Sequence, residues 1–290
     1  MGSGTWTTAA YSAYNASTGK SYDISTNRVV NQEFSQRMLD PDLDPRMFTI
    51  RECVNTDEHP DTVPVILALD VTGSMGRSCK ETAEALGVIM TSLYEKHKDI
   101  EFCVMGIGDL AYDSAPIQMS QFESDVRIAE ALDKIFMEHG GGGNAYESYT
   151  AAWWMALNRT SLDRINKQGK KGIIITMGDE PLNPYLPKDR LNTAVNGNVQ
   201  DDINTKDLYE KVTEKFDVFH IAVDDDGNCY QDYKGRIRDT FGKLLGQRFV
   251  VSTINNLAAT ITDCIDSAIE ESTGTGTPVN TVNENGEITW

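Results

Sequence analysis

Two groups of oxygen-bearing side chains stand where the strands of a parallel sheet would end. Asp70 directly follows an apolar run, and Thr72 and Ser74 follow it at alternate positions of a turn. Asp179 follows a second apolar run later in the chain. Carboxylate and hydroxyl oxygens are the ligands that hard divalent cations such as Mg²⁺ prefer. The spacing therefore predicts a cation site in which these four side chains are ligands.

A glycine-rich loop lies between the two carboxylates. Residues 140–143 are four consecutive glycines, and Asn144 follows them. A backbone without side chains can approach an ion closely, and the amide oxygen of Asn144 is a neutral ligand. Asn144 is therefore predicted as the fifth ligand. Glu147, three residues later, is expected to cap the next helix or to orient the loop rather than to bind the ion.

Apolar runs alternate with helical patterns over most of the chain. Runs typical of strands covered on both faces are expected at 63–69, 100–107, 172–177, 218–223 and 248–251, with a short antiparallel edge strand at 117–122. Helices are expected at 81–97, 125–139, 147–157, 207–216 and 256–269. This alternation predicts an α/β fold with a doubly wound, mostly parallel sheet flanked by helices. Its ligands are expected at the carboxyl ends of the strands.

Composition divides the chain into three parts. Residues 1–61 are rich in Ser, Thr, Asn and Asp and are interpreted as a polar N-terminal arm with a short helix at 32–39. Residues 62–271 hold the α/β domain. Residues 272–290 are rich in Thr, Gly and Asn and are interpreted as a flexible C-terminal tail.

Charge and cysteine content restrict the class of protein. The 290 residues include 26 Lys and Arg against 44 Asp and Glu, a net charge of −18. This balance argues against nucleic acid or an anionic membrane as a partner. The five cysteines are scattered without a CxxC pair, and the first residues lack the pattern of a secretory signal. We therefore expect a cytoplasmic protein.

The predicted ligands resemble a known pattern, that of von Willebrand factor A (VWA) domains with a metal-ion-dependent adhesion site (MIDAS). That pattern is D-x-S-x-S after the first strand, a Thr in a G-G-x-T loop and an Asp after the fourth strand. The resemblance covers about residues 61–271 and is strongest to intracellular members, such as the VWA domains attached to α-kinases. Thr replaces the first Ser, and Asn replaces the loop Thr. The matching residues, in order, are Asp70, Thr72, Ser74, Asn144 and Asp179.

The resemblance implies a Rossmann-like VWA fold and a function in protein binding rather than catalysis. In the family, the bound ion keeps one coordination position open, and a partner protein fills it with an acidic side chain. The chain is thus expected to be a metal-dependent adaptor or adhesion module that captures an Asp or Glu of another protein. The cation is expected to be Mg²⁺, with Mn²⁺ or Ca²⁺ as alternatives. Met75, Gly143 and Glu180 are expected to contact the partner beside the ion.

Two other functions stay open at this point. An Asp after a first strand is also the nucleophile of Mg²⁺-dependent phosphohydrolases with a D-x-D signature, although here Thr72 stands where the second carboxylate would act as general acid. The chain could also be a structural assembly subunit in which the ion only stabilises the loops. Dependence of partner binding on Mg²⁺ separates this last function from the adhesion module.

Overall fold

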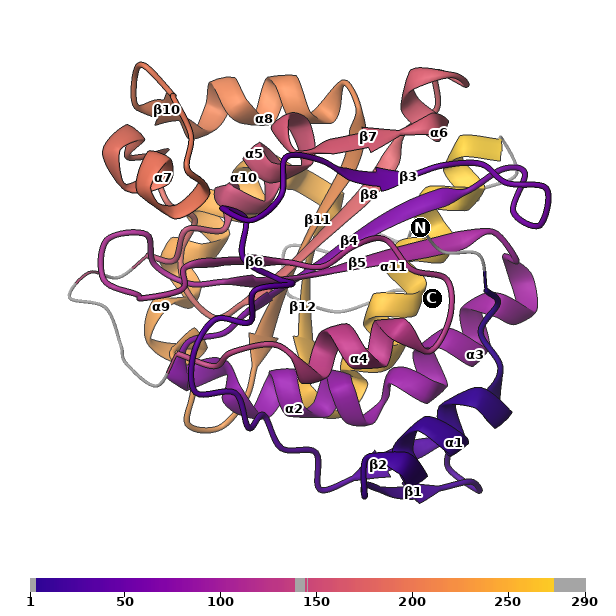
Figure 1. Cartoon of the computed structure of the whole chain (residues 1–290). Helices are drawn as coiled ribbons and strands as arrows, with labels where there is room; N and C mark the ends of the chain where they lie inside the picture. The colour runs from indigo at the N-terminus through magenta and orange to yellow at the C-terminus, as the bar shows by residue number, and fades with distance from the viewer. Residues whose placement is uncertain (1–3, 139–143, 145, 274–290) are drawn as a thin grey trace.

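A six-stranded sheet forms the middle layer of the protein (Figure 1). The structure is a computed structural model that describes residues 4–138, 144 and 146–273. All neighbouring strands are parallel except the last pair, which is antiparallel. The expected α/β class, the mostly parallel sheet and its antiparallel edge strand are therefore confirmed. In spatial order the strands are β12 (Phe249–Thr253), β11 (Phe216–Asp224), β8 (Gly172–Gly178), β4 (Val63–Asp70), β5 (Ile100–Ile107) and β6 (Ile117–Met119).

Helices cover both faces of this sheet (Figure 1). Side chains of a strand point alternately to its two faces, so Val65 and Leu67 of β4 join one apolar cluster and Ile66 joins the other. Both faces are buried, which explains the uninterrupted apolar runs. On the first face lie α2 (Gly76–Glu84), α3 (Leu86–Lys96), α4 (Arg127–Asp133) and α11 (Leu257–Thr273). On the second face lie α5 (Thr150–Asn158), α7 (Lys188–Val195), α8 (Thr205–Thr213) and α9 (Tyr230–Ile237).

The winding direction of the sheet reverses between β4 and β8. From β4 the chain continues outward to β5 and β6 on one side, whereas β8, β11 and β12 follow one another on the other side. The connection after the carboxyl end of β4 therefore runs to one side of the sheet, and the connection after the carboxyl end of β8 runs to the other side. In open α/β sheets, ligands bind outside the carboxyl ends of the strands at such a point.

Several predicted helices have different limits in the structure. The helix expected at 81–97 begins earlier and is divided into α2 and α3 at Ala85, whereas that expected at 125–139 is reduced to α4. No helix forms at 32–39. There the backbone N–H of Gln32 donates to Glu84 (2.9 Å) and its side-chain amide donates to Asp133 (2.9 Å), so contacts with the domain replace helical hydrogen bonds.

The segment before β4 packs against the body of the protein. Trp6, Tyr11 and Val29 are buried in the cluster on the first face of the sheet. The segment contains α1 (Thr8–Ser17) and a hairpin of β1 (Ser21–Asp23) and β2 (Arg28–Val30). Its last strand, β3 (Arg51–Cys53), pairs in parallel with β7 (Thr160–Leu162). The remaining short elements are α6 (Asp163–Asn166), β9 (Tyr185–Leu186), β10 (Ile203–Asn204) and α10 (Lys243–Leu245).

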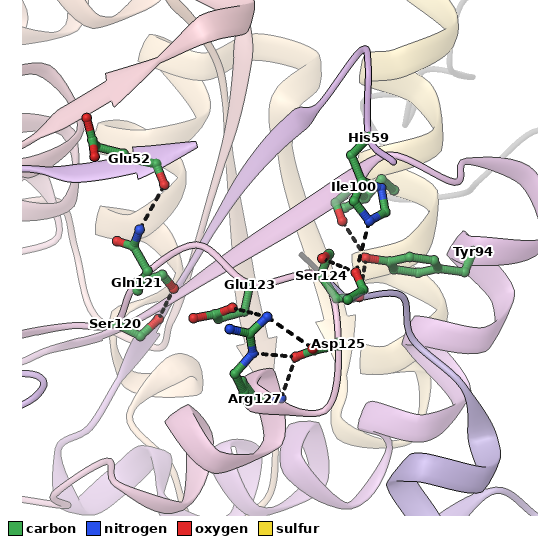
Figure 2. Close-up of polar contacts among 11 residues, drawn as sticks. Glu52, His59, Tyr94, Ile100, Ser120, Gln121, Glu123, Ser124, Asp125 and Arg127 are labelled. Atoms are coloured by element: carbon green, nitrogen blue, oxygen red, sulfur yellow. Dashed lines mark hydrogen bonds and ion pairs between the residues drawn. The ribbon is translucent and has the colours of Figure 1, made fainter. Parts of the chain in front are cut away.

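Polar contacts hold the connection between β6 and α4 in place (Figure 2). The hydroxyl of Tyr94 donates to the carbonyl oxygen of Ser124 (2.8 Å). Arg127 donates to the carboxylate of Asp125 (2.8 Å), and the amide of Gln121 donates to the carbonyl oxygen of Glu52 in β3 (3.0 Å). The contact of Gln121 with Glu52 joins the sheet edge to the N-terminal segment. No helix in the described ranges is long and apolar enough to cross a membrane.

Candidate metal centre

Asp70 is the last residue of β4, and its carboxylate is held from both sides. It is fully buried. One oxygen, Oδ1, accepts hydrogen bonds from the backbone N–H of Thr72 (3.0 Å) and from the Thr72 hydroxyl (2.5 Å). The other, Oδ2, accepts a hydrogen bond from the hydroxyl of Tyr149 (2.7 Å). The orientation of this carboxylate is therefore fixed before any ligand binds.

Ser74 links this turn to the neighbouring strand end. It lies in a 3₁₀ turn, Gly73–Met75, between β4 and α2. Its hydroxyl donates to Oδ1 of Asp179 (3.1 Å), directly after β8, and the backbone N–H of Cys229 donates to Oδ2 of Asp179 (2.7 Å). The structure thus brings together four of the five predicted ligands, which are Asp70, Thr72, Ser74 and Asp179.

The other predicted site residues lie differently. Asn144 is exposed, and its side-chain oxygen accepts the N–H of Tyr146 (3.2 Å); within the described residues no hydrogen bond joins it to the four ligands. Gly143 lies outside the described residues. Met75 is fully buried in the core, where it offers a partner no accessible surface. Glu180 is partly exposed directly beside Asp179.

Two further acidic side chains face the same region. Glu147 and Asp109 are 3% and 4% exposed, and each has one buried carboxylate oxygen without a hydrogen-bond partner. One carboxylate oxygen of Glu180 is buried and unpartnered as well. Glu147 does not cap α5, since that helix begins at Thr150 and no side chain caps it. A buried oxygen without a hydrogen-bond donor is costly, and a cation or a water molecule bound beside these groups would offset that cost.

Burial and mutual repulsion raise the pKa values of these acids. Burial, and next the charge of Asp179, raises the pKa of Asp70 to about 8. Burial, followed by the charges of Asp70 and Glu180, raises the pKa of Glu147 to about 11. Burial also raises the pKa of Asp179. In the described part of the chain, no Lys, Arg or His forms a salt bridge with Asp70, Glu147, Asp179 or Glu180.

Sequence reasoning missed Glu147, Asp109 and Tyr149. Asp109 follows β5 by two residues and could have been found by inspecting the end of every strand, as for Asp70. Glu147 precedes a helical pattern, which favours a helix-capping or loop-orienting role over a place in the metal centre. Tyr149 carried no signal, because a tyrosine beside apolar residues is typical of a core.

The donor set suits a hard cation. Two carboxylates and two hydroxyls supply oxygen ligands and negative charge, and among the described residues no salt bridge joins Asp70 or Asp179 to a basic side chain. Among the described residues, no three His, Cys, Asp or Glu side chains converge closely enough to hold an ion by themselves. An ion here would therefore depend on the hydroxyls of Thr72 and Ser74, and on water, as well as on Asp70 and Asp179.

Comparisons with known proteins give limited similarity. No family model matches the sequence, and no curated protein matches it. The pilus adhesin SpaC from Lactobacillus rhamnosus GG, in its open conformation, is 13% identical with a TM-score of 0.49, and the match covers 75% of this chain but 31% of the adhesin. Proximal thread matrix protein 1 from the mussel byssus is 11% identical with a TM-score of 0.46, and the match covers 72% of this chain and 48% of that protein.

Proposed function

We propose that the protein is a metal-dependent binding module whose domain, residues 62–271, is a Rossmann-like VWA domain with a MIDAS. The bound Mg²⁺, or Mn²⁺ or Ca²⁺, would be held directly by Thr72 and Ser74, and directly or through water by Asp70 and Asp179. When bound, the ion supplies an open coordination position for an Asp or Glu of a partner protein. The five free cysteines agree with a reducing, cytoplasmic location.

One observation carries this proposal. Asp70 and Asp179 are buried at neighbouring strand ends, and Ser74, in the turn after Asp70, donates to Asp179; neither carboxylate forms a salt bridge with a basic side chain in the described residues. Two buried negative charges repel each other unless a cation lies between or beside them. The hydroxyls add neutral oxygens without adding charge, which leaves the ion able to attract one further carboxylate.

The arrangement favours binding over phosphoester hydrolysis. Thr72 uses its hydroxyl to hold Asp70, so the position two residues after the candidate nucleophile offers no general acid. Both oxygens of Asp70 accept hydrogen bonds from within the protein, which reduces the nucleophilicity of the carboxylate. The alternative function, an assembly subunit with a stabilising ion, is distinguished from the binding module by whether partner binding depends on Mg²⁺.

The test measures cation binding and partner binding in the same variants. Calorimetric titration with Mg²⁺ and Mn²⁺ is expected to give one site in the unchanged protein and at least about tenfold weaker binding in Ser74→Ala and Asp179→Asn. A pull-down from the native host, with Mg²⁺ or with chelator, is expected to lose its partner with chelator and in both variants.

Ser25→Ala is the matched control. Ser25 also donates its hydroxyl to an aspartate, Asp23 (2.7 Å), but in the exposed hairpin of the N-terminal segment. This variant is expected to keep both activities. If the protein binds Mg²⁺ in the titration but still retains its partner in the pull-down with chelator, the ion has a structural role only. Unchanged Mg²⁺ binding by Ser74→Ala and Asp179→Asn would show that the site is wrong.

A further inference from the structure

The connection between β11 and α9 contacts one of the proposed metal ligands. Cys229, the last residue before α9, donates its backbone N–H to Oδ2 of Asp179 (2.7 Å). The other oxygen of this carboxylate, Oδ1, accepts a hydrogen bond from the hydroxyl of Ser74 (3.1 Å). Asp179 is therefore oriented by two donors, and one of them belongs to the loop of residues 225–229.

Hydrogen bonds give the 225–229 loop a defined shape. The side-chain amide of Asn228 donates to the carbonyl oxygen of Val223 (2.8 Å), and its backbone N–H donates to the carbonyl oxygen of Asp225 (3.3 Å). Gly227, between them, has a φ of 93°, which favours glycine. The loop is a short, bonded turn, so a displacement of Asp225 is transmitted to Cys229.

Arg77 attaches this loop to α2. Its Nη1 lies 2.9 Å from Oδ2 of Asp225 and donates to the carbonyl oxygen of Asp226 (3.1 Å). The side chain of Arg77 is 65% exposed, but that of Asp225 is only 9% exposed. In the described ranges, no other Lys, Arg or His forms a salt bridge with Asp225. One arginine thus compensates the charge of a nearly buried carboxylate.

Arg77 and Ser74 act on Asp179 from the same short stretch of chain. Ser74 lies in the 3₁₀ turn before α2, and Arg77 lies in the first turn of α2. Ser74 holds one oxygen of Asp179, and Arg77 holds the loop whose Cys229 holds the other oxygen. The contacts therefore form a closed ring, and removal of the Arg77 side chain opens it on the side of the loop.

We propose that Arg77 is a positioning residue of the metal centre, which keeps the 225–229 loop in place so that Cys229 holds Asp179 in the orientation that binds the cation. The inference rests on the proposed function, and it adds a residue that is not among the proposed ligands. Residues that directly orient a metal ligand typically raise metal affinity by about 10–100-fold. Arg77 acts one step further away, through the loop, so we expect about a three- to tenfold effect.

The sign of the effect separates positioning from a simple effect of charge. Arg77 is positively charged and like charges repel, so a role through charge alone predicts that Arg77→Ala binds Mg²⁺ more tightly. Positioning predicts weaker binding. The change does not weaken α2, because alanine is a good helix former and a positive charge is unfavourable at a helix N-terminus. The metal-free variant is therefore expected to keep its unfolding midpoint, since an exposed ion pair contributes little to stability.

The test compares the full chain with Arg77→Ala by calorimetric titration with Mg²⁺ at about 0.15 M salt and by amide hydrogen exchange followed by NMR. Arg77→Ala is expected to bind Mg²⁺ about three- to tenfold more weakly. Without metal, its Cys229 amide is expected to exchange faster, whereas the amides of the sheet keep their rates. Arg248→Ala is the matched control, because Arg248 also pairs with a nearly buried aspartate, Asp217 (2.8 Å), at the opposite end of β11. This variant is expected to bind Mg²⁺ as the unchanged protein does.

The outcomes separate this inference from the proposed function. Mg²⁺ binding by Arg77→Ala that is unchanged or tighter would overturn the positioning role and leave the metal centre standing. An unchanged exchange rate of the Cys229 amide would overturn it as well, because Arg77 would then not hold the loop. If the unchanged protein binds no Mg²⁺, the proposed function and this inference both fail. Thermal unfolding verifies that Arg77→Ala is folded; if it is not, Arg77→Gln, which also removes the ion pair, is measured with the same expected results.

Discussion

Tyr149 offers the most direct test of how the metal centre is built. Its buried hydroxyl donates to Oδ2 of Asp70 (2.7 Å) and accepts a hydrogen bond from the backbone N–H of Glu180 (3.3 Å). One phenol oxygen therefore links the ends of β4 and β8. We predict that Tyr149→Phe, which removes this oxygen alone, weakens cation binding although Tyr149 is not among the proposed ligands.

The structure sets the size of the effect. A hydrogen bond to a charged acceptor contributes about 1.5–3 kcal/mol, and its loss leaves one carboxylate oxygen of Asp70 without its donor. Loss of a residue that orients a metal ligand typically weakens metal binding by about 10–100-fold. We therefore expect Tyr149→Phe to lower the free energy of unfolding by about 1.5–3 kcal/mol without Mg²⁺ at a pH above the raised pKa of Asp70, where this carboxylate is charged. The dissociation constant of Mg²⁺ is expected to rise by at least tenfold.

The assay combines calorimetric titration with urea unfolding, each with and without Mg²⁺. A ligand at 100 times its dissociation constant stabilises the folded state by about 2.7 kcal/mol, so the Mg²⁺-induced gain in stability is an independent measure of affinity. Tyr185→Phe is the control, because Tyr185 is 47% exposed. If Tyr149→Phe bound Mg²⁺ as tightly as the unchanged protein, the idea that this hydroxyl orients Asp70 would be refuted.

Three further predictions concern other parts of the molecule. In Gly178→Ala, the new Cβ would lie 2.0 Å from the Tyr149 hydroxyl. We therefore expect a loss of about 1–3 kcal/mol in unfolding free energy, and weaker Mn²⁺ binding in a calorimetric titration. Gly235→Ala is the control, because a Cβ at Gly235 meets no atom within 4 Å. Burial raises the pKa of Glu101 to about 7 from 4.5, so the folded state holds a proton that the unfolded chain has lost. The Glu101 carboxyl therefore contributes a fall in stability as pH rises through this window, by at most about 1.4 kcal/mol per pH unit, and urea titrations of Glu101→Gln are expected to show a pH slope smaller by that contribution. The purified protein with Mg²⁺ is expected to release no phosphate from a generic phosphoester, and turnover that Asp70→Ala abolishes would contradict the binding function.

The sheet could be predicted from the sequence because its signal is local. A strand buried on both faces is apolar at most positions, and β4, β5, β8 and β11 each show a mainly apolar run. The parts that were missed depend on distant contacts. The helix expected at 32–39 is replaced by bonds from Gln32 to residues of α2 and α4, which no local pattern reveals.

The candidate site divides in the same way. Asp70, Thr72, Ser74 and Asp179 could be found because each directly follows a predicted strand, and strand ends meet at one edge of a parallel sheet. Glu147 and Tyr149 reach the site from the segment that leads into α5, whose start lay three residues later than its pattern indicated. Helix limits are the least reliable part of a sequence-based prediction, and here the shift concealed two buried polar side chains.

The central position of β4 has a consequence for synthesis on the ribosome. β4 pairs with β5 soon after both emerge, but its other neighbour, β8, follows about 100 residues later. At about 5–20 residues per second, one edge of an apolar central strand stays unpaired for about 5–20 s. An open apolar edge pairs readily with another chain. Overexpression should therefore favour aggregation of nascent chains, because many chains expose this edge at the same time. Slower translation before residue 172 should increase the aggregation further, because each edge then stays unpaired for longer.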